Sequence, residues 1–291
     1  MRLDEFYKLV VKLGGQMDPR KNKFIASYPD TAILYGKADT QVNKLLVGID
    51  IEVPELLLAE RIREREGLDL VIGHHPEGRA FASLAKVMQV QVDILKQAGV
   101  DLNLAQKLLD ERMQEVGRRL LSANHTRPVD AARLLDMPFM CMHTPADNHV
   151  FDYLTQLMNK KKPKKVCDIV DILSDIPEYR NAEQISVGPR LILGNPNCRV
   201  GKILFEMTGG TEGSKDVFGK LYKAGVRTLV SMHLSEEHFK KVKDANLNVV
   251  IAGHISSDTL GLNLLLDGIE KKAKEKFHVI SCSGFQRISR N

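Results

Sequence analysis

The chain of 291 residues contains no tryptophan, and aromatic residues make up only 5% of it. No apolar stretch approaches the roughly 20 residues that a membrane-spanning helix requires, and the N-terminal segment lacks the long apolar region of a secretory signal. Hydrophobic residues at 43% and charged residues at 27% are typical of a globular protein. We therefore expect a protein that does not cross a membrane and that resides in the cytoplasm.

Cysteine is also scarce, with four residues in the chain and no two of them in C-x-x-C spacing. This scarcity argues against a zinc-thiolate knot and against a disulfide framework. Most of the cysteines lie in or beside apolar runs, so buried structural thiols in a reducing compartment are the favoured interpretation. The four positions are Cys141, Cys167, Cys198 and Cys282.

Charge of neither sign dominates, because 42 Lys and Arg residues stand against 37 Asp and Glu residues, for a formal net charge of +5. This mildly basic balance falls well short of an electrostatic footprint for nucleic acid. One basic cluster spans residues 160–165 and contains Pro163. A solvated linker is the favoured interpretation of this cluster, and an anion- or nucleic-acid-binding patch is the alternative.

Strand-like and helix-like segments alternate along both halves of the chain. In the first half, we expect strands at residues 44–50, 68–73 and 138–142, with helices at 54–67 and 82–121. In the second half, we expect strands at 199–207, 228–233, 248–252 and 278–282, with helices at 214–224, 235–246 and 259–274. Such alternation predicts βαβ units, largely parallel sheets and the α/β fold class.

The two halves repeat one pattern, which indicates an internal duplication. In each half a strand ends in His-x-x-x-Asp, with His143 and Asp147 in the first and His254 and Asp258 in the second. We expect two α/β lobes whose strand ends face one shared cleft, where open α/β sheets usually hold ligands. The expected division is a first lobe at 1–158 with a helical insertion at about 101–137, a basic linker at 159–166, and a second lobe at 167–291.

Two adjacent histidines, His74 and His75, follow the apolar run at residues 68–73. Neighbouring side chains at a strand end point in different directions, so the pair can serve two adjacent metal ions more easily than it can chelate one. A two-ion site needs further ligands, including a carboxylate or water that bridges ions roughly 3.5–4 Å apart. The candidate ligands are His74, His75, Asp147, His254 and Asp258. Such side chains suit zinc, iron, manganese or nickel.

The spacing of His254 and Asp258 supports a shared ion, because residues four apart at a helix start lie on one face. The alternative is that Asp258 only caps the helix while His254 hydrogen-bonds a loop. The pattern H-x-x-x-D is weak by itself, so these two residues gain meaning only together with the rest of the set.

Other histidines are candidates for supporting roles near such a site. His143 is expected to orient a ligand rather than to bind an ion, because a proline-containing turn separates it from Asp147. His233 and His238 flank a strand end, and either of them, or His143, is a candidate for proton transfer. His125 follows the long helical region, where a loop or surface position is the favoured interpretation.

A glycine-rich segment lies between an expected strand and an expected helix. Backbone amides in such a loop can cradle a phosphate at the helix N-terminus. The spacing is not that of a P-loop, because Gly-Ser-Lys replaces Gly-Lys-Ser/Thr. A phosphorylated ligand and a plain turn therefore both remain open. The candidate residues are Gly209, Gly210, Gly213 and Ser214.

Three short blocks follow apolar strands in a fixed order along the chain. They are Gly-His-His-Pro at 73–76, His-Thr-Pro-Ala-Asp at 143–147 and Gly-His-Ile-Ser-Ser-Asp at 253–258. The three blocks resemble motifs of the Nif-three-like family (the NGG-interacting-factor type), many of whose members are labelled GTP cyclohydrolase I type 2 homologues. The family's matching blocks are its first metal motif, His-Thr-Asn-Leu-Asp, and Gly-His-Tyr-Ala-Thr-Glu.

The resemblance implies a fold, a metal site and an assembly. It implies two intertwined, duplicated α/β lobes with a mixed sheet in each and a metal cleft between them, and hexameric toroids with metal sites facing an inner cavity. It implies that His74, His75, Asp147 and His254 are ligands of two metal ions. Asp258 stands where the family usually has Glu and would be the bridging carboxylate, one methylene shorter. The stretch from about 101 to 138 is longer than in a compact family member, and the family's Thr-Gly-Asp segment has no clear equivalent here.

Two hypotheses for function follow. The first is a metal-dependent hydrolase in which two divalent ions generate a hydroxide nucleophile, with a nucleotide or other phosphorylated small molecule as the substrate. The second is a non-catalytic metal-binding scaffold, a metal-delivery protein or a transcription-regulatory partner. Turnover of phosphoesters by the metal-loaded protein discriminates between them.

Overall fold

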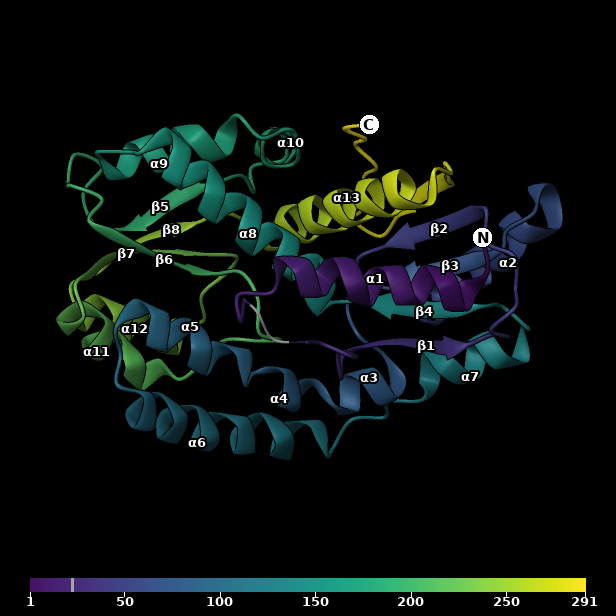
Figure 1. The fold of residues 1–291 in the computed structure, drawn as a ribbon, viewed down its shortest axis with the longest axis horizontal. Helices are drawn as coiled ribbons and strands as arrows, with labels where there is room; N and C mark the ends of the chain where they lie inside the picture. The colour runs from purple at the N-terminus through teal and green to yellow at the C-terminus, as the bar shows by residue number, and fades with distance from the viewer. Residues whose placement is uncertain (22–23) are drawn as a thin grey trace.

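The computed structural model describes residues 1–21 and 24–291. These residues form two sheets, one of five strands and one of four, which lie side by side along the long axis of the molecule with helices on both faces (Figure 1). Each sheet contains both parallel and antiparallel strand pairs. The α/β class with a mixed sheet in each lobe, expected from the sequence, is therefore confirmed.

The first sheet has the strand order β1-β4-β3-β2-β9. Its strands are β1 (Thr31–Tyr35), β4 (Phe139–Met142), β3 (Leu70–Gly73), β2 (Lys44–Gly48) and β9 (His278–Cys282). β1 is antiparallel to β4, and the other neighbours are parallel. Because β9 comes from the end of the second half and pairs with β2, the two lobes are intertwined.

The second sheet has the strand order β5-β8-β7-β6. Its strands are β5 (Arg190–Leu193), β8 (Asn248–Ile251), β7 (Val226–Ser231) and β6 (Lys202–Glu206). β5 is antiparallel to β8, and the other pairs are parallel. In both sheets the antiparallel strand lies at an edge, and neither β1 nor β5 was expected from the sequence.

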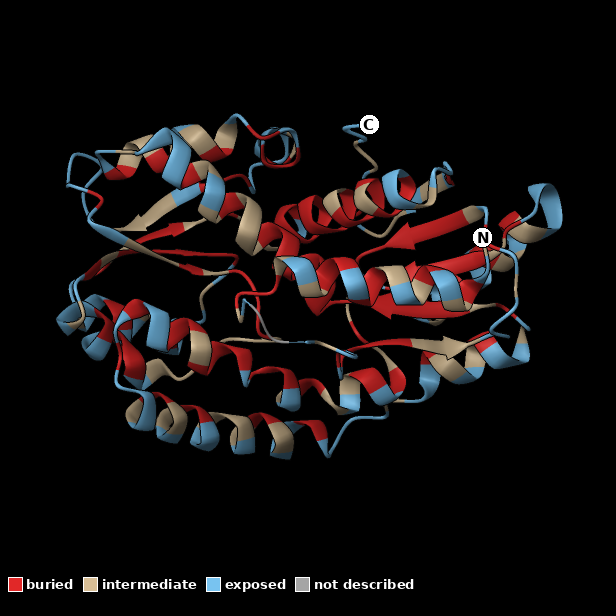
Figure 2. Ribbon diagram, in the orientation of Figure 1, coloured by how far each residue is buried: buried red, intermediate tan, exposed pale blue. Residues whose placement is uncertain are grey.

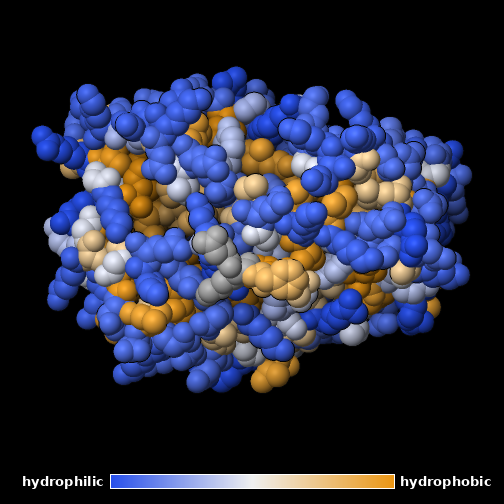
Figure 3. Space-filling model, viewed as in Figure 1, coloured by the Kyte–Doolittle hydropathy of each residue, from blue (hydrophilic) through white to orange (hydrophobic). Residues whose placement is uncertain are grey.

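Three helices pack against one another between the sheets and solvent: α1 (Leu3–Met17), α8 (Thr144–Lys161) and α13 (His254–Ala273). α1 and α13 contribute to the core under the first sheet, and α8 also packs into the core of the second lobe against β6 and β7. Their inward faces are buried, as are most strand residues (Figure 2). On the face shown in Figure 3, hydrophilic residues cover most of the surface.

Most of the remaining helices cover the other faces of the sheets, and two of them pack on the same side as α8 and α13. α2 (Val53–Glu66) and α7 (Arg127–Leu134) pack on the first sheet in a core of their own. A further hydrophobic core packs the helices between residues 84 and 120 against the second lobe. The other helices are α3 (Gly78–Ala82), α4 (Leu84–Val87), α5 (Val90–Ala98), α6 (Leu102–Leu120), α9 (Val166–Ser174), α10 (Pro177–Gln184), η1 (Lys215–Val217), α11 (Phe218–Lys223) and α12 (Glu236–Asp244).

The helical region expected at 82–121 is interrupted, and the interruptions have local causes. Gly99 adopts a left-handed conformation with φ of 98° and ends α5, a role for which glycine carries no Cβ penalty. Asp101 then accepts a hydrogen bond from the Leu104 amide and begins α6. The last expected helix also begins earlier than 259, because α13 starts at His254.

The basic cluster is exposed on both sides of the end of α8. Lys160 and Lys161 form the last turn of that helix, where positive charge complements the helix dipole. Lys165 then pairs with Arg199 through an isolated β-bridge.

The domain boundaries drawn from the sequence stay a prediction. Within the described ranges, no helix is both long enough and apolar enough to cross a bilayer.

Candidate metal centre

The candidate ligands come together where strands from both sheets end. His74 and His75 follow β3, and His143 follows β4 and precedes α8. His254 opens α13 directly after β8 of the second sheet. Strand ends of this kind place polar side chains without disturbing a core, which is why open α/β sheets bind ligands there. The cluster therefore lies between the two lobes.

One group of candidate ligands consists of His74, Asp147 and one carboxylate oxygen of Asp258. The Nε2 atom of His74 lies 3.4 Å from Asp147 Oδ1 and 3.4 Å from Asp258 Oδ1. All three residues are buried, with at most 4% of their surface exposed. Their potential ligand atoms lie close enough together to hold one metal ion.

A second group of candidate ligands consists of His75, His254 and the other carboxylate oxygen of Asp258. Asp258 Oδ2 lies 3.4 Å from His75 Nε2 and 3.5 Å from His254 Nε2. The rings of His75 and His254 are 5.1 Å apart, and both side chains are partly exposed. This group could also hold a metal ion, and Asp258 belongs to both groups.

Several of these atoms are buried without a hydrogen-bond partner among the described residues. They are both ring nitrogens of His74, Oδ1 of Asp147 and both carboxylate oxygens of Asp258. Buried polar atoms are nearly always hydrogen-bonded, because an unpaired one costs about 1–3 kcal/mol or more. Unpaired atoms from three residues in one cluster, with one ring nitrogen available from His74, therefore fit a bound cation, and their nitrogen and oxygen chemistry fits a first-row divalent metal.

The electrostatics of the cluster also favour a cation. Burial disfavours a charged His74, but the Asp258 and Asp147 carboxylates outweigh it and raise the pKa of His74 to about 10. Burial of His75 is likewise outweighed, by the nearby Asp258 carboxylate and by the hydrogen bond to Asp50, and its pKa rises to about 9. Against its own burial, the imidazoles hold the pKa of Asp258 far below its usual range. A divalent ion would supply the same positive charge and displace the protons.

His143 lies closer to the cluster than the sequence indicated. Its ring centroid is 4.8 Å from that of His74, and its Nε2 is 3.8 Å from Asp147 Oδ2. It could also hold an ion together with His74 and His75. On the other side of the ring, Nδ1 lies 2.7 Å from a carboxylate oxygen of Asp30, which is fully buried. Asp30 therefore fixes the orientation of this imidazole.

Asp50 fixes the orientation of the His75 imidazole in the same way. It follows the end of β2, and its Oδ1 lies 2.6 Å from His75 Nδ1. The hydrogen bond from His75 is the main cause that lowers the pKa of Asp50. With Nδ1 engaged in this way, Nε2 of His75 is left facing Asp258. Asp30 and Asp50 were both missed by sequence reasoning, although Asp50 does stand at a strand end.

We expect Asp50→Asn to weaken metal binding by about 10- to 100-fold, the usual loss when a carboxylate behind a histidine ligand is removed. More than half of the Asp50 side chain is exposed, so the fold should tolerate the change. Titration with zinc against a competing chelator measures the affinity. An unchanged affinity would mean that Asp50 does not orient His75.

The two remaining candidate histidines differ in their positions. His233 lines the same small cavity as Asp147 and Asp258, and its ring lies 4.7 Å from that of His254. His238 is buried behind the cavity wall, with Nε2 3.0 Å from the Gly213 carbonyl oxygen and Nδ1 2.8 Å from Ser235 Oγ. Both of its nitrogens are therefore engaged in holding the loop.

The glycine-rich loop forms another wall of this cavity. Gly209 and Gly210 have φ of 107° and 83°, and a Cβ on Gly209 would lie 2.7 Å from Gln91 Cγ. The Gln91 amide donates to the carbonyl oxygens of Gly209 and Thr211. The Gly213 amide is directed at the Glu206 carboxyl group, and Ser214 caps η1. Binding of a phosphate by this loop stays a prediction, and the nearby carboxylates do not favour it.

His125 has a local structural role. Its Nε2 lies 2.9 Å from the Leu120 carbonyl oxygen, and its ring packs edge-on against Phe81. This arrangement agrees with the loop position expected for His125.

Sequence comparison finds neither a family model nor a curated protein that matches this chain. Structure comparison does find matches. A NIF3 superfamily protein from Sphaerobacter thermophilus matches with a TM-score of 0.78 at 26% identity, over 94% of this chain and 97% of that one. The chain therefore resembles a NIF3 superfamily protein in fold across nearly its whole length.

Two more distant structures share the same fold. Reduced HcgD from Methanocaldococcus jannaschii has a TM-score of 0.55 at 16% identity, over 97% of each chain. TTHA1606 from Thermus thermophilus has a TM-score of 0.53 at 14% identity, again over 97% of each chain. The NIF3-like resemblance expected from three sequence motifs is thus confirmed by the fold across nearly the whole chain.

Proposed function

We propose that this chain is a metal-dependent hydrolase with a dinuclear metal centre, acting on a nucleotide or another phosphorylated small molecule. The observation that carries the proposal is the placement of Asp258, whose two oxygens face two separate groups of ligand atoms. A carboxylate shared in this way offsets the repulsion between two neighbouring dications.

In this proposal each ion has its own ligands. His74, Asp147 and Asp258 would hold one ion, and His75, His254 and Asp258 would hold the other. Zinc, iron, manganese and nickel all suit imidazole and carboxylate ligands. His143, held by Asp30, either completes the first set or orients it.

When bound, two such ions lower the pKa of water, polarise the attacked phosphoryl group and offset its negative charge. The residues of the chain position that chemistry: Asp30 and Asp50 fix imidazole rings, and the buried Asp147 and Asp258 supply negative charge. The cavity over the cluster has about 50 Å³ of space that water can enter, enough for only one or two water molecules. The reacting group would therefore enter while the rest of the substrate stays outside.

A phosphorylated substrate is supported by the net positive charge of the chain and by the suitability of paired ions for phosphoryl oxygens. The proposal does not extend to ring opening of GTP. The hexameric toroid that the family resemblance implies stays a prediction, and the proposed chemistry does not depend on it.

The test is turnover of a panel of phosphomonoesters, phosphodiesters and nucleotides by the zinc- or manganese-loaded chain. We expect hydrolysis that chelation abolishes and metal restores, and that is lost in His75→Ala. His278→Ala removes an exposed histidine on β9 and should leave turnover unchanged. A chain that carries two ions yet hydrolyses no member of the panel would contradict the proposal and favour the metal-binding scaffold.

A further inference from the structure

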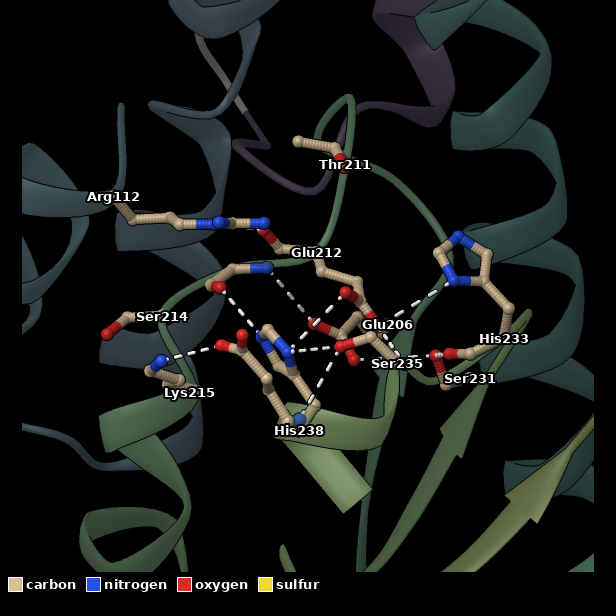
Figure 4. Close-up of polar contacts among 12 residues, drawn as sticks. Arg112, Glu206, Thr211, Glu212, Ser214, Lys215, Ser231, His233, Ser235 and His238 are labelled. Carbon is tan, nitrogen blue, oxygen red and sulfur yellow. Dashed lines mark hydrogen bonds and ion pairs between the residues drawn. The ribbon is translucent and has the colours of Figure 1, made fainter. Parts of the chain in front are cut away.

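A second group of ionisable side chains lies across the cavity from the metal ligands. Glu206 is the last residue of β6 and is paired in register with Ser231, the last residue of β7 (Figure 4). Glu206, Glu212 and His233 line the same cavity as Asp147 and Asp258. Two carboxyl groups therefore face the space where a substrate would react.

Glu212 is held as an anion. Its Oε1 accepts a hydrogen bond from the Ser235 amide at 2.6 Å, and its Oε2 lies 3.4 Å from Nδ1 of His238 (Figure 4). His233 lies 3.7 Å away through its own Nδ1. Burial opposes ionisation of this carboxyl group, but His233 and the Ser235 amide outweigh it and lower the pKa of Glu212 to about 2.

Glu206 has the opposite surroundings. Its hydrogen bonds from the Gly213 amide and the Ser231 hydroxyl are long, at 3.5 and 3.4 Å. The Ser231 hydroxyl instead donates at 2.7 Å to the His233 carbonyl oxygen. On its other side, Glu206 borders a pocket lined mainly by apolar residues, including Phe218. A carboxylate held so weakly against apolar groups favours its neutral form.

The charged groups around Glu206 do not reverse its preference for the neutral form. Burial is the main cause that raises the pKa of Glu206; the Glu212 carboxylate adds to it, and His238 and His233 oppose it. Two carboxyl groups whose pKa values are driven apart in one cavity form the usual arrangement of an acid and an anion at an active site. The ionisable groups that line the same cavity from the metal-ligand side are His143, which precedes α8, Asp147 of α8, and His254 and Asp258 of α13.

We propose that Glu206 is the general acid of the hydrolysis, the residue that protonates the leaving oxygen of a phosphate ester. This inference rests on the proposed function. The water oxygen forms a bond to phosphorus while the bond from phosphorus to the leaving oxygen breaks. The electron pair of the broken bond stays on the leaving oxygen, which takes the proton of Glu206. The resulting carboxylate regains a proton from the attacking water. Glu212 stays ionised and, with His238, holds the loop.

The first test observes the proton directly in the zinc-loaded chain. Infrared spectra at neutral pH should contain the carbonyl stretch of a protonated carboxylic acid that Glu206→Gln removes and Glu212→Gln leaves in place. Burial raises the pKa of Glu77 to about 7, so Glu77→Gln identifies any second acid band. A wild-type spectrum without a band that depends on Glu206 would overturn the proposal, whatever the turnover.

The second test compares two esters that differ in their leaving group. A poor leaving group needs a proton, so Glu206→Gln should lower kcat for phenyl phosphate by about 100-fold or more. It should lower kcat for p-nitrophenyl phosphate much less, because p-nitrophenolate leaves without one. Metal content should not change. Glu236→Gln, at an exposed position on α12, is the matched control and should behave as wild type with both esters.

The outcomes separate the two proposals. If the wild type hydrolyses both esters and Glu206→Gln slows both equally, Glu206 only supports the cavity wall and the general-acid role is wrong. If the zinc-loaded wild type hydrolyses neither ester nor any other member of the panel, the proposed function itself fails, and the role of Glu206 fails with it.

Discussion

Asp258→Asn should cost the chain both metal ions. One carboxylate faces both groups of ligand atoms, so its loss removes a ligand from each ion and the negative charge between them. Loss of a residue behind a ligand typically costs 10- to 100-fold in affinity or activity. Removal of the shared ligand itself should therefore lower hydrolysis by more than about 100-fold. Elemental analysis of the dialysed protein should find fewer than one ion per chain, against close to two in wild type.

Asp244→Asn is the matched control for this change, because Asp244 ends α12 at an exposed position outside the cluster. It should retain both ions and full turnover. Thermal melting in the presence of chelator shows whether Asp258→Asn still folds. A folded Asp258→Asn variant that retains two ions would show that the carboxylate does not join them.

Gly261→Ala should lower both the stability of the chain and its metal affinity. Gly261 lies in α13, and a Cβ there would sit 2.6 Å from the Ala146 carbonyl oxygen in the first turn of α8. On the other side of that turn, a Cβ on Gly14 would sit 2.5 Å from Pro145 Cβ. Asp147 follows directly, so the close approach of the helices sets the distance between Asp147 and Asp258.

Forcing a methyl group into this contact should cost about 1–3 kcal/mol, the usual penalty for overpacking. At roughly 2–4 °C per kcal/mol for large domains, the Tm should fall by several degrees. Gly117→Ala is the control, because Gly117 lies within α6 with nothing near the position of its Cβ. That change should stabilise the helix by about 0.5–1 kcal/mol. A Gly261→Ala variant that melts and binds zinc as wild type would mean that the helices can part without disturbing the site.

The positions of the candidate ligands could be predicted from the sequence because each one follows a recognisable strand. His74 and His75 end the apolar run that becomes β3, and His254 follows the run that becomes β8. The carboxyl ends of parallel strands meet at one edge of a sheet. Local pattern therefore indicated a shared site before any contact was known.

The supporting carboxylates could not be predicted in the same way. Asp30 is 113 residues from His143 in the sequence, and Asp50 is 25 residues from His75. Aspartate is common at strand ends and turns, so only the folded contact identifies these two residues. Glu206 lies inside a strand pattern, and nothing in that pattern shows that its carboxyl group lines a cavity.

The edge strands were missed for a related reason. β1 and β5 are short and irregular, and each contains a register shift against its antiparallel partner. The return of β9 to the first sheet was equally invisible, because a strand pattern does not reveal which strand it will join. The spacing of hydrophobic residues along the sequence predicts that a strand exists. Which strand pairs with it depends on the whole fold.

The most direct measurement is an anomalous difference map from crystals of the zinc-loaded chain, collected on both sides of the zinc absorption edge. Two peaks about 3.5–4 Å apart are expected, one beside His74 and Asp147 and the other beside His75 and His254, with the Asp258 carboxylate between them. A single peak, or peaks away from Asp258, would contradict a dinuclear centre in this chain.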